Sequence, residues 1–357
     1  MRKLVTLQKI KDLLPIPGAE KIELALLENK AWKVVVAKGL HQKGDIIIFC
    51  EIDSLLPIRP EFEFLRQSSY TTEFGVEGFR LRTIELRNRI SQGLILPLDI
   101  LKNFEQAKQE TDLFLGNSIC IKEDAINNKD LTEILGIRLA EKEIDMSAID
   151  LIKGAFPADI SKTTIERIQN VPEAIRDYAG KVFIETEKLD GGSSTYFLKP
   201  VSDDITDLKF GVCSKTVEMI LDEKNPYGKY ALDNKLEEKF RSLGEVCVLQ
   251  GEYLPKQGYY DLSEPTVYFF RKFNPLSYQA ESYEQFKETT ERLGLKTVPI
   301  INENYIMPNT VDELLKEANG MSILNPKRKR EGIVLTLKEN PNVWIKIISN
   351  KKLIEDK

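Results

Sequence analysis

The stretch KVFIETEKLDGG, residues 181–192, decides the fold of the second half of this 357-residue chain. It opens with the apolar–polar alternation of a half-buried β-strand and ends in a lysine, a carboxylate and two glycines. Glycines let a backbone approach a ligand closely, and a lysine becomes a nucleophile once its pKa is lowered. The alternative is a lysine-bearing turn on a solvated surface. The stretch therefore predicts a strand and a turn, with Lys188 as a candidate reactive group.

Four later strand-like segments carry further charged and aromatic residues. They supply, in chain order, a carboxylate, an aromatic run, a second carboxylate and a second lysine: Gln250–Glu252, Val267–Phe270, Glu331–Val334 and Trp344–Ile348. With Asp190 they give three acids and two lysines at strand ends, which are the residue types that a Mg²⁺–polyphosphate site needs. A nearby aromatic face can stack on a base. Each residue taken singly fits an ordinary strand end or core equally well, so the prediction depends on their joint order.

The composition limits which chemistry the chain can perform. With 42% hydrophobic and 30% charged residues, it fits neither the disordered nor the membrane class. A net charge of −5 excludes a uniformly basic surface, so any polyphosphate must bind at a local cluster. The four cysteines show no CxxC spacing, and the single histidine, His41, leaves little room for a catalytic triad or a multi-histidine metal site. Without a signal-peptide pattern, a cytoplasmic location is expected.

A prior of about 150 residues per domain predicts two domains. The first hundred residues read as short strands separated by turn signals, at Ile22–Leu27, Lys33–Val36, Asp45–Phe49 and Phe79–Ile84. This spacing indicates a small OB-type barrel over residues 1–100. Residues 101–150 turn polar and helical in pattern, as in Asp130–Leu135 and Ala140–Ile144, and are expected to form a connector.

A second and larger sheet domain is expected over residues 151–357. Helices are predicted at Leu232–Leu243, Tyr283–Leu293 and Val311–Ala318, the last opened by a capping box of Thr310 and Glu313. The chain has no GxGxxG or GxxxxGK[ST] match, so neither a Rossmann nor a P-loop site is expected.

The segments that carry the chemistry resemble a known superfamily. KLDG (188–191), QGE (250–252), YFF (268–270), EGIVL (331–335) and WIKIIS (344–349) resemble motifs I, III, IIIa, IV and V of the covalent nucleotidyltransferases, which comprise RNA ligases, DNA ligases and mRNA capping enzymes. Segments 161–170 and 210–215 look like those of ATP-dependent RNA ligases. Segments 15–25, 38–57 and 80–98 resemble the OB domain that precedes the catalytic domain in RNA ligases of the Naegleria type. Capping enzymes and most DNA ligases carry this domain after motif V, so its position favours an RNA ligase.

This resemblance implies an α+β fold. An N-terminal OB-type β-barrel would be followed by a nucleotidyltransferase (ATP-grasp-like ligase) domain of antiparallel sheets with flanking helices. It also implies a three-step reaction, in which Lys188 takes AMP from ATP, the AMP passes to an RNA 5′-phosphate, and a 3′-hydroxyl displaces it. The implied cofactors are ATP and Mg²⁺ or Mn²⁺. The alternatives left open are a DNA ligase, a capping-type guanylyltransferase and a non-catalytic RNA-binding protein.

Residue roles follow from the resemblance. The implied catalytic residues are Lys188, Asp190, Glu252, Glu331 and Lys346, of which the three acids would hold a metal through water. The implied ATP-binding residues are Thr186, Glu187, Lys188, Arg167, Lys215, Glu252, Phe270 and Lys346. Two positions depart from the family: Lys215 replaces an arginine, and Lys346 lacks a second motif V lysine because Trp344 and Ile348 flank it. The missing contact would come from another group, for which Lys351 is a candidate.

Basic clusters are candidate RNA contacts. They are Arg80, Arg82, Arg87 and Arg89 in the barrel domain, and Lys327 and Arg328 before Glu331. Even spacing within each arginine pair would place both side chains on one face, and OB faces suit nucleic acid. A solvated loop explains Lys327 and Arg328 equally well. The expected partner is RNA with 5′-phosphate and 3′-hydroxyl ends, with no membrane and no obligate protein partner.

Overall fold

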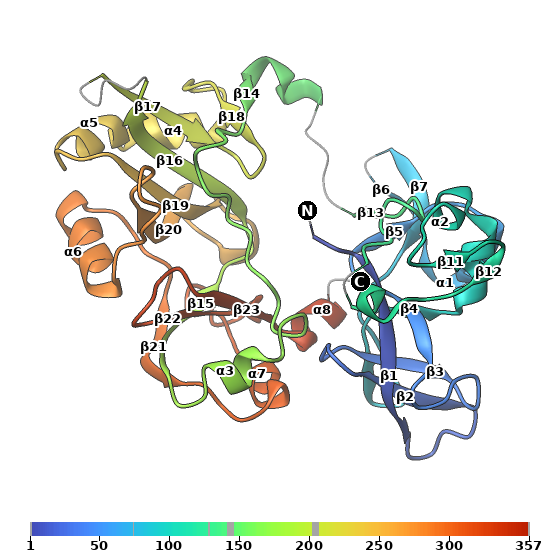
Figure 1. Ribbon diagram of the computed structural model, residues 1–357. Coiled ribbons are helices and arrows are strands. Elements are labelled where there is room, and N and C mark those ends of the chain that lie inside the picture. Colours follow the sequence, from blue (N-terminus) through green and yellow to red (C-terminus); the bar gives the residue numbers. More distant parts are fainter. Residues whose placement is uncertain (1, 74, 128, 141–145, 202–206, 356–357) are drawn as a thin grey trace. The chain divides into compact units, whose positions relative to one another are not determined.

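The computed structural model describes residues 2–73, 75–127, 129–140, 146–201 and 207–355, which form two compact units (Figure 1). Unit 1 comprises residues 1–143, 169–172 and 353–357, and unit 2 comprises residues 144–168 and 173–352. The chain therefore enters unit 2, returns briefly to unit 1, and enters unit 2 again before it reaches its C-terminal residues.

Unit 1 is built mainly from antiparallel strands. Its five-stranded sheet has the order β10 (Leu94–Leu96), β4 (Ile46–Cys50), β1 (Val5–Pro15), β2 (Ile22–Leu27) and β3 (Lys33–Ala37). A four-stranded sheet has the order β13 (Arg138–Leu139), β5 (Ser54–Leu56), β7 (Val76–Arg80) and β6 (Tyr70–Glu73). Two hairpins are formed by β8 (Ile84–Leu86) with β9 (Arg89–Ser91) and by β11 (Phe114–Leu115) with β12 (Ser118–Ile119). The helical segments are η1 (Pro60–Leu65), α1 (Arg66–Ser69), η2 (Leu98–Asn103), α2 (Glu105–Lys108) and η3 (Glu123–Ala125).

Strand β4 explains why the run IIIFC is apolar at every position. Ile48 and Cys50 belong to one hydrophobic core, whereas Ile47 and Phe49 belong to another. Successive side chains of a strand point to opposite faces, so a strand buried on both faces has no polar position. This strand divides the core of unit 1 into two halves.

Most strands expected in the first hundred residues are present, and Ile22–Leu27 has the predicted bounds. The segment expected to run from Phe79 to Ile84 is instead divided, because β7 ends at Arg80 and β8 begins at Ile84.

Residues 101–139, expected to form a connector, pack into unit 1. Leu101, Phe114, Leu131 and Leu135 are buried in the same core as β1 and β5. Asp130–Leu135 forms turns rather than a helix, and residues 141–144 of the other expected helix lie outside the described residues.

Unit 2 contains two antiparallel sheets. The six-stranded sheet has the order β14 (Ile152–Ala155), β18 (Val217–Met219), β17 (Leu208–Cys213), β16 (Gly192–Pro200), β19 (Cys247–Leu254) and β20 (Thr266–Phe273). The four-stranded sheet has the order β21 (Ile300–Ile306), β15 (Val182–Lys188), β22 (Gly332–Leu337) and β23 (Trp344–Ile348). The helices are η4 (Met146–Leu151), α3 (Ala174–Asp177), α4 (Pro226–Asp233), α5 (Leu236–Arg241), η5 (Gly258–Tyr260), α6 (Tyr283–Leu293), α7 (Val311–Glu317) and the first residues of α8 (Asn350–Glu355), which belongs to unit 1 from Leu353.

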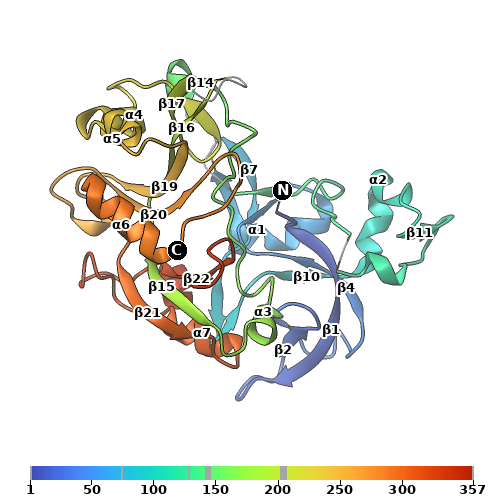
Figure 2. The ribbon, with the colours of Figure 1, turned by 60° about the vertical axis from the view of Figure 1, so that its left-hand side comes forward.

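Helices cover one face of the six-stranded sheet. Figures 1 and 2 show α4 and α5 beside β16 and β17, and Tyr196 and Phe210 of these strands share a core with Phe240 of α5. The same core includes Phe286 of α6. This packing fixes the sheet that supplies one side of the site described below.

Three expected helices can be compared with the structure. The helix Tyr283–Leu293 has the predicted bounds, and the capping box of Thr310 and Glu313 opens α7 as expected. The expected helix Leu232–Leu243 is wrong as a single element, because α4 ends at Asp233 and α5 begins at Leu236. Lys235 between them has a left-handed backbone (φ 51°), which breaks the helix. Across the described residues, no helix is both long and apolar enough to span a bilayer.

Candidate active site

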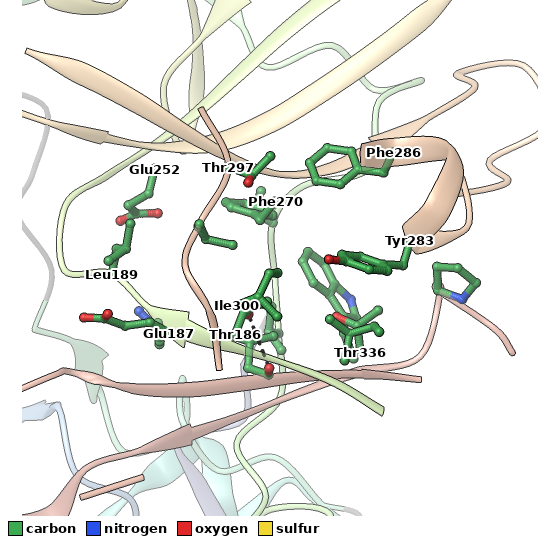
Figure 3. Close-up of a pocket in the computed structure, with 18 of the residues that line it drawn as sticks. Thr186, Glu187, Leu189, Glu252, Phe270, Tyr283, Phe286, Thr297, Ile300 and Thr336 are labelled. Atoms are coloured by element: carbon green, nitrogen blue, oxygen red, sulfur yellow. Dashed lines mark hydrogen bonds between the residues drawn. The ribbon is translucent and has the colours of Figure 1, made fainter. Parts of the chain in front are cut away.

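The site lies where the chain passes from the four-stranded sheet to the six-stranded sheet. Strand β15 ends at Lys188, and β16 begins four residues later at Gly192. Ile184, Thr186 and Lys188 alternate along β15 and all border a cavity of ≈ 530 Å³. In Figure 3, Glu252 and Phe270 approach this cavity from one side, and Thr186, Ile300 and Thr336 from the other. Both sheets therefore contribute to one cavity.

The turn after Lys188 is held by side chains from distant segments. The Asp190 amide donates to Tyr260 Oη at 2.7 Å, and the Gly191 amide donates to Glu252 Oε1 at 3.1 Å. A Cβ at Gly191 would come within 2.5 Å of the Tyr253 carbonyl oxygen, so a larger residue cannot fit without a shift. The first of the two glycines is thus required by close packing.

Lys188 forms an ion pair inside the cavity. Its Nζ lies 2.6 Å from Glu331 Oε2, and both side chains are about one-fifth exposed (23% and 21%). Glu331 reaches this place because β22 pairs with β15 in a register that sets Lys188 opposite Gly332. Glu252 lines the same cavity from β19.

Negative charge exceeds positive charge around the lysine. Burial alone would lower the pKa of Lys188, but Glu331, Glu252 and Asp190 outweigh burial and raise this pKa above its ordinary value. Burial, together with the nearby Glu331 and Asp190, raises the pKa of Glu252 to about 7, although Lys188 opposes the rise. Burial raises the pKa of Glu331 as well, while Lys188 and Lys346 oppose the rise. Lys188, Glu252 and Glu331 therefore hold protons more tightly than usual, so the cluster can accept further positive charge.

The three acids suit a divalent cation held through water molecules. Carboxylate oxygens are the preferred ligands of Mg²⁺, which keeps several waters in most protein sites. Among the described residues, no three His, Cys, Asp or Glu side chains converge closely enough to hold a metal ion directly. The carboxylate oxygens and the surplus of negative charge fit a divalent cation that keeps water molecules.

Aromatic rings form the other end of the cavity. Phe270 of β20 lies 6.0 Å from Trp344 of β23, measured between ring centres, and both line the cavity. Tyr283 and Phe286 of α6 also line the cavity, to the right of Phe270 in Figure 3. The Thr186 hydroxyl donates to the Val334 carbonyl oxygen at 3.3 Å. These rings offer an aromatic surface on which a flat ring can stack, in the same cavity as the charged cluster.

The other residues expected to bind ATP differ in their position. Lys346 and Lys215 line the cavity, whereas the cavity-lining residues do not include Arg167. Arg167 is buried next to Lys346, since the backbones on either side of it bond to Lys346 at 3.0 and 3.1 Å. Glu187 borders the cavity, but its Oε2 accepts a hydrogen bond from the Ile323 amide at 2.7 Å. Because Glu187 alternates with Thr186 and Lys188, its carboxylate points to the opposite face of β15.

The candidate RNA contacts in unit 1 fall into two groups. Arg82, Arg87 and Arg89 are exposed, and Arg87 lies in the tight turn of the β8–β9 hairpin with a φ of 50°. Arg80 is half-buried, with a guanidinium nitrogen 3.9 Å from Asp53. Only the first three therefore present their side chains on the surface of unit 1.

The candidate RNA contacts in unit 2 are Lys327 and Arg328, and both are exposed. The Arg328 guanidinium lies 5.5 Å from the centre of the Tyr259 ring. Arg330 in the same run is buried and donates to the carbonyl oxygens of Glu317 and Ala318. In the basic segment 327–330, Lys327 and Arg328 therefore lie at the surface, whereas Arg330 has a structural role.

Sequence reasoning missed several residues of the cavity. Trp344 was noted only as replacing a lysine, and Tyr283, Phe286, Thr163 and Ser193 were not proposed. The Thr163 and Ser193 hydroxyls share a hydrogen bond of 2.7 Å at the cavity wall. The apolar spacing of Tyr283 and Phe286 on α6 was visible in the sequence, but it does not distinguish a side chain that faces a cavity from one that faces the core.

Comparisons with known proteins agree on both units. A family profile described as an OB-fold domain matches residues 4–98, and one described as RNA ligase matches residues 181–348. A solved structure of Naegleria gruberi RNA ligase with PPi is similar over 100% of both chains, with 31% identity and a TM-score of 0.83. A mutant of that ligase solved with AMP and Mn matches with 31% identity over 100% of this chain and 99% of that one, at a TM-score of 0.83. Another mutant, solved with ATP and Mn, matches with 30% identity over 99% of both chains, at a TM-score of 0.82. The comparison with curated proteins gives no match.

Proposed function

The chain belongs to the RNA ligase family, and we propose that it joins RNA ends through a covalent nucleotide on Lys188. As a member of this family it is an ATP-dependent RNA ligase with an N-terminal OB-fold domain. The observation that carries the role of Lys188 is its position. Its ammonium lies at the end of a strand, in a cavity whose lining also includes Asp190, Glu252, Glu331, Lys346 and several aromatic rings.

Lys188 must lose a proton before it can attack a phosphorus atom. Without ligands its pKa is raised, so the amine is charged at neutral pH. Glu331 Oε2 lies 2.6 Å from Nζ and is placed to take this proton, and the raised pKa of Glu331 favours the transfer. When bound, a divalent cation supplies the positive charge that offsets the three acids and the phosphates.

The remaining residues bind and orient the nucleotide. Phe270 offers a ring on which adenine can stack, and Lys346 and Lys215 lie where they can contact phosphate or ribose oxygens. Asp190, Glu252 and Glu331 would hold the water shell of a bound divalent cation. The backbones of Glu166 and Ile168, on either side of Arg167, bond to the backbone of Lys346 and hold it in place.

We propose RNA with a 5′-phosphate and a 3′-hydroxyl as the substrate. Lys188 attacks the α-phosphate of ATP and displaces pyrophosphate. The AMP then passes from Lys188 to the 5′-phosphate, and the 3′-hydroxyl displaces AMP to form the phosphodiester. Arg82, Arg87 and Arg89 of unit 1 and Lys327 and Arg328 of unit 2 are exposed cations suited to phosphate.

Labelling of the protein tests this proposal. Full-length protein is incubated with Mg²⁺ or Mn²⁺ and with either ATP or GTP labelled at the α-phosphate, and the labelled peptide is mapped. We expect ATP to label Lys188, Lys188→Ala to remove the label, and the surface change Lys224→Ala to leave it intact. Sealing of nicked RNA is then compared with sealing of nicked DNA. Label on another lysine, or label from GTP alone, would contradict the proposal.

A further inference from the structure

A second buried cation lies beside the turn that follows Lys188. Lys352 of α8 has a side chain that is only 5% exposed, and its Nζ lies 3.6 Å from Asp190 Oδ2. The same Nζ lies 4.4 Å from the centre of the Tyr259 ring. Lysine is rarely buried without compensation, because removing an ammonium from water costs several kcal/mol. The carboxylate and the ring together provide that compensation.

The backbone that carries Lys352 is tied to Glu331. The Ser349 amide donates to the Glu331 carbonyl oxygen at 2.8 Å, and Ser349 Oγ accepts from the Lys352 amide at 3.2 Å. Ser349 Oγ also donates to Asn319 Oδ1 at 2.8 Å. The backbone of Lys352 is therefore held close to Glu331, and its side chain extends to Asp190.

Asp190 is the most exposed of the acids near Lys188. Its side chain is 50% exposed, against 21% for Glu331. Its amide is fixed by Tyr260 Oη, but that bond leaves the carboxylate free to rotate about the side-chain bonds. An ion pair with a buried ammonium restricts this rotation, because turning the carboxylate away weakens the compensation of the buried charge.

We propose that Lys352 is a positioning residue that holds the Asp190 carboxylate in the orientation needed when Lys188 receives its nucleotide. The Tyr259 ring contacts the same ammonium and helps to hold it in place. This proposal rests on the proposed function, since it takes Lys188 to be the nucleophile. Lys352 acts through Asp190 rather than through the nucleotide.

The test compares Lys352→Met, which keeps the length of the stem, with Lys352→Arg, which keeps the charge. Lysyl-AMP formation is followed in single turnovers over a range of ATP concentrations, and sealing of nicked RNA is followed alongside. We expect Lys352→Met to lower the maximal rate of lysyl-AMP formation about tenfold, with the half-saturating ATP concentration changed less than about threefold. Lys352→Arg should restore the rate to within about threefold of the wild type.

A double-mutant cycle decides whether the effect passes through Asp190. In an Asp190→Asn background, Lys352→Met should lower the rate by less than about twofold, because the pair is already broken. Additive losses, or a rise in the half-saturating ATP concentration at an unchanged maximal rate, would overturn the proposal. The second result would make Lys352 a direct nucleotide contact.

A further pair of variants covers the case in which Lys352→Met does not fold. Tyr259→Phe keeps the ring and removes only the hydroxyl, which donates to the Lys329 carbonyl oxygen at 2.6 Å, whereas Tyr259→Leu removes the ring. Tyr259→Leu should slow lysyl-AMP formation and Tyr259→Phe should not. Equal rates of lysyl-AMP formation in the two variants would contradict the proposed contact between the Tyr259 ring and Lys352. If the wild-type protein forms no lysyl-AMP, the proposed function fails, and that result is distinct from either outcome here.

Discussion

Glu185 lies on the strand of the nucleophile, three residues before Lys188, and its burial makes the stability of unit 2 depend on pH. The side chain is 1% exposed. Burial raises its pKa from 4.5 to about 7, Glu317 adds to the rise, and Arg330 opposes it. Because the folded-state pKa is higher than the unfolded one, the stabilising contribution is complete below pH 4.5 and is lost as the pH rises through about 7. The perturbation that tests this is Glu185→Gln.

The size of the effect follows from the shift. A rise from 4.5 to about 7 corresponds to about 3 kcal/mol of unfolding free energy lost by pH 8. Glutamine has nearly the shape of a protonated glutamate and does not ionise. Glu185→Gln should therefore be within about 1 kcal/mol of the wild type at pH 5 and exceed it by about 3 kcal/mol at pH 8.

Urea unfolding at constant ionic strength between pH 5 and pH 8 measures this difference. The chain has two tryptophans, Trp32 in unit 1 and Trp344 in unit 2. A Trp32→Phe background leaves Trp344 fluorescence to report on unit 2. The exposed change Glu288→Gln on α6 is the matched control and should give a small difference that does not vary with pH. A difference for Glu185→Gln that stays constant from pH 5 to pH 8 would refute the reasoning.

Three further predictions concern the acids of the site, the arginines of the β8–β9 hairpin and a glycine of β22. Glu252→Ala and Glu331→Ala should each slow lysyl-AMP formation at least about 100-fold while melting stays close to that of the wild type; normal turnover in either would exclude its role. Arg87→Ala combined with Arg89→Ala should leave lysyl-AMP formation intact and slow sealing of nicked RNA about tenfold, more at high salt; a wild-type sealing rate across a salt series would remove RNA binding from this hairpin. Gly332→Ala would place its Cβ 2.1 Å from a backbone oxygen of β23, so it should destabilise the chain by about 2 kcal/mol or more in urea unfolding; a loss under about 0.5 kcal/mol would contradict this.

Local patterns predicted much of the fold because they act over a few residues. The strand before Lys188, the helix Tyr283–Leu293 and the capping box at Thr310 all depend on short-range alternation, periodicity or side-chain bonds to nearby amides. The break at Lys235 was not predictable, since a left-handed backbone at a lysine has no sequence signal. The packing of residues 101–139 was missed because their polar pattern concealed Leu131 and Leu135, whose burial depends on distant strands.

The residues of the candidate site were likewise predictable only in part. The order of charged segments indicated Lys188, Glu252, Glu331 and Lys346, and the structure brings all four to one cavity, while their roles stay predictions. Lys352 has no such signal, because a lysine near a chain end reads as solvated until tertiary structure buries it. A functional residue outside a motif can be identified only from its contacts in the structure.

The turn after β15 is held by partners that are far away in the sequence. The bonds of Lys188, Asp190 and Gly191 to Glu331, Tyr260 and Glu252 span 143, 70 and 61 residues. Such contacts form late in folding, since each requires a long loop to close. At about 5–20 residues per second, a ribosome needs roughly 7–30 s after adding Lys188 to reach Glu331. During this interval Lys188 lacks its partner Glu331, so we expect the nascent chain not to react with ATP until β22 joins the sheet.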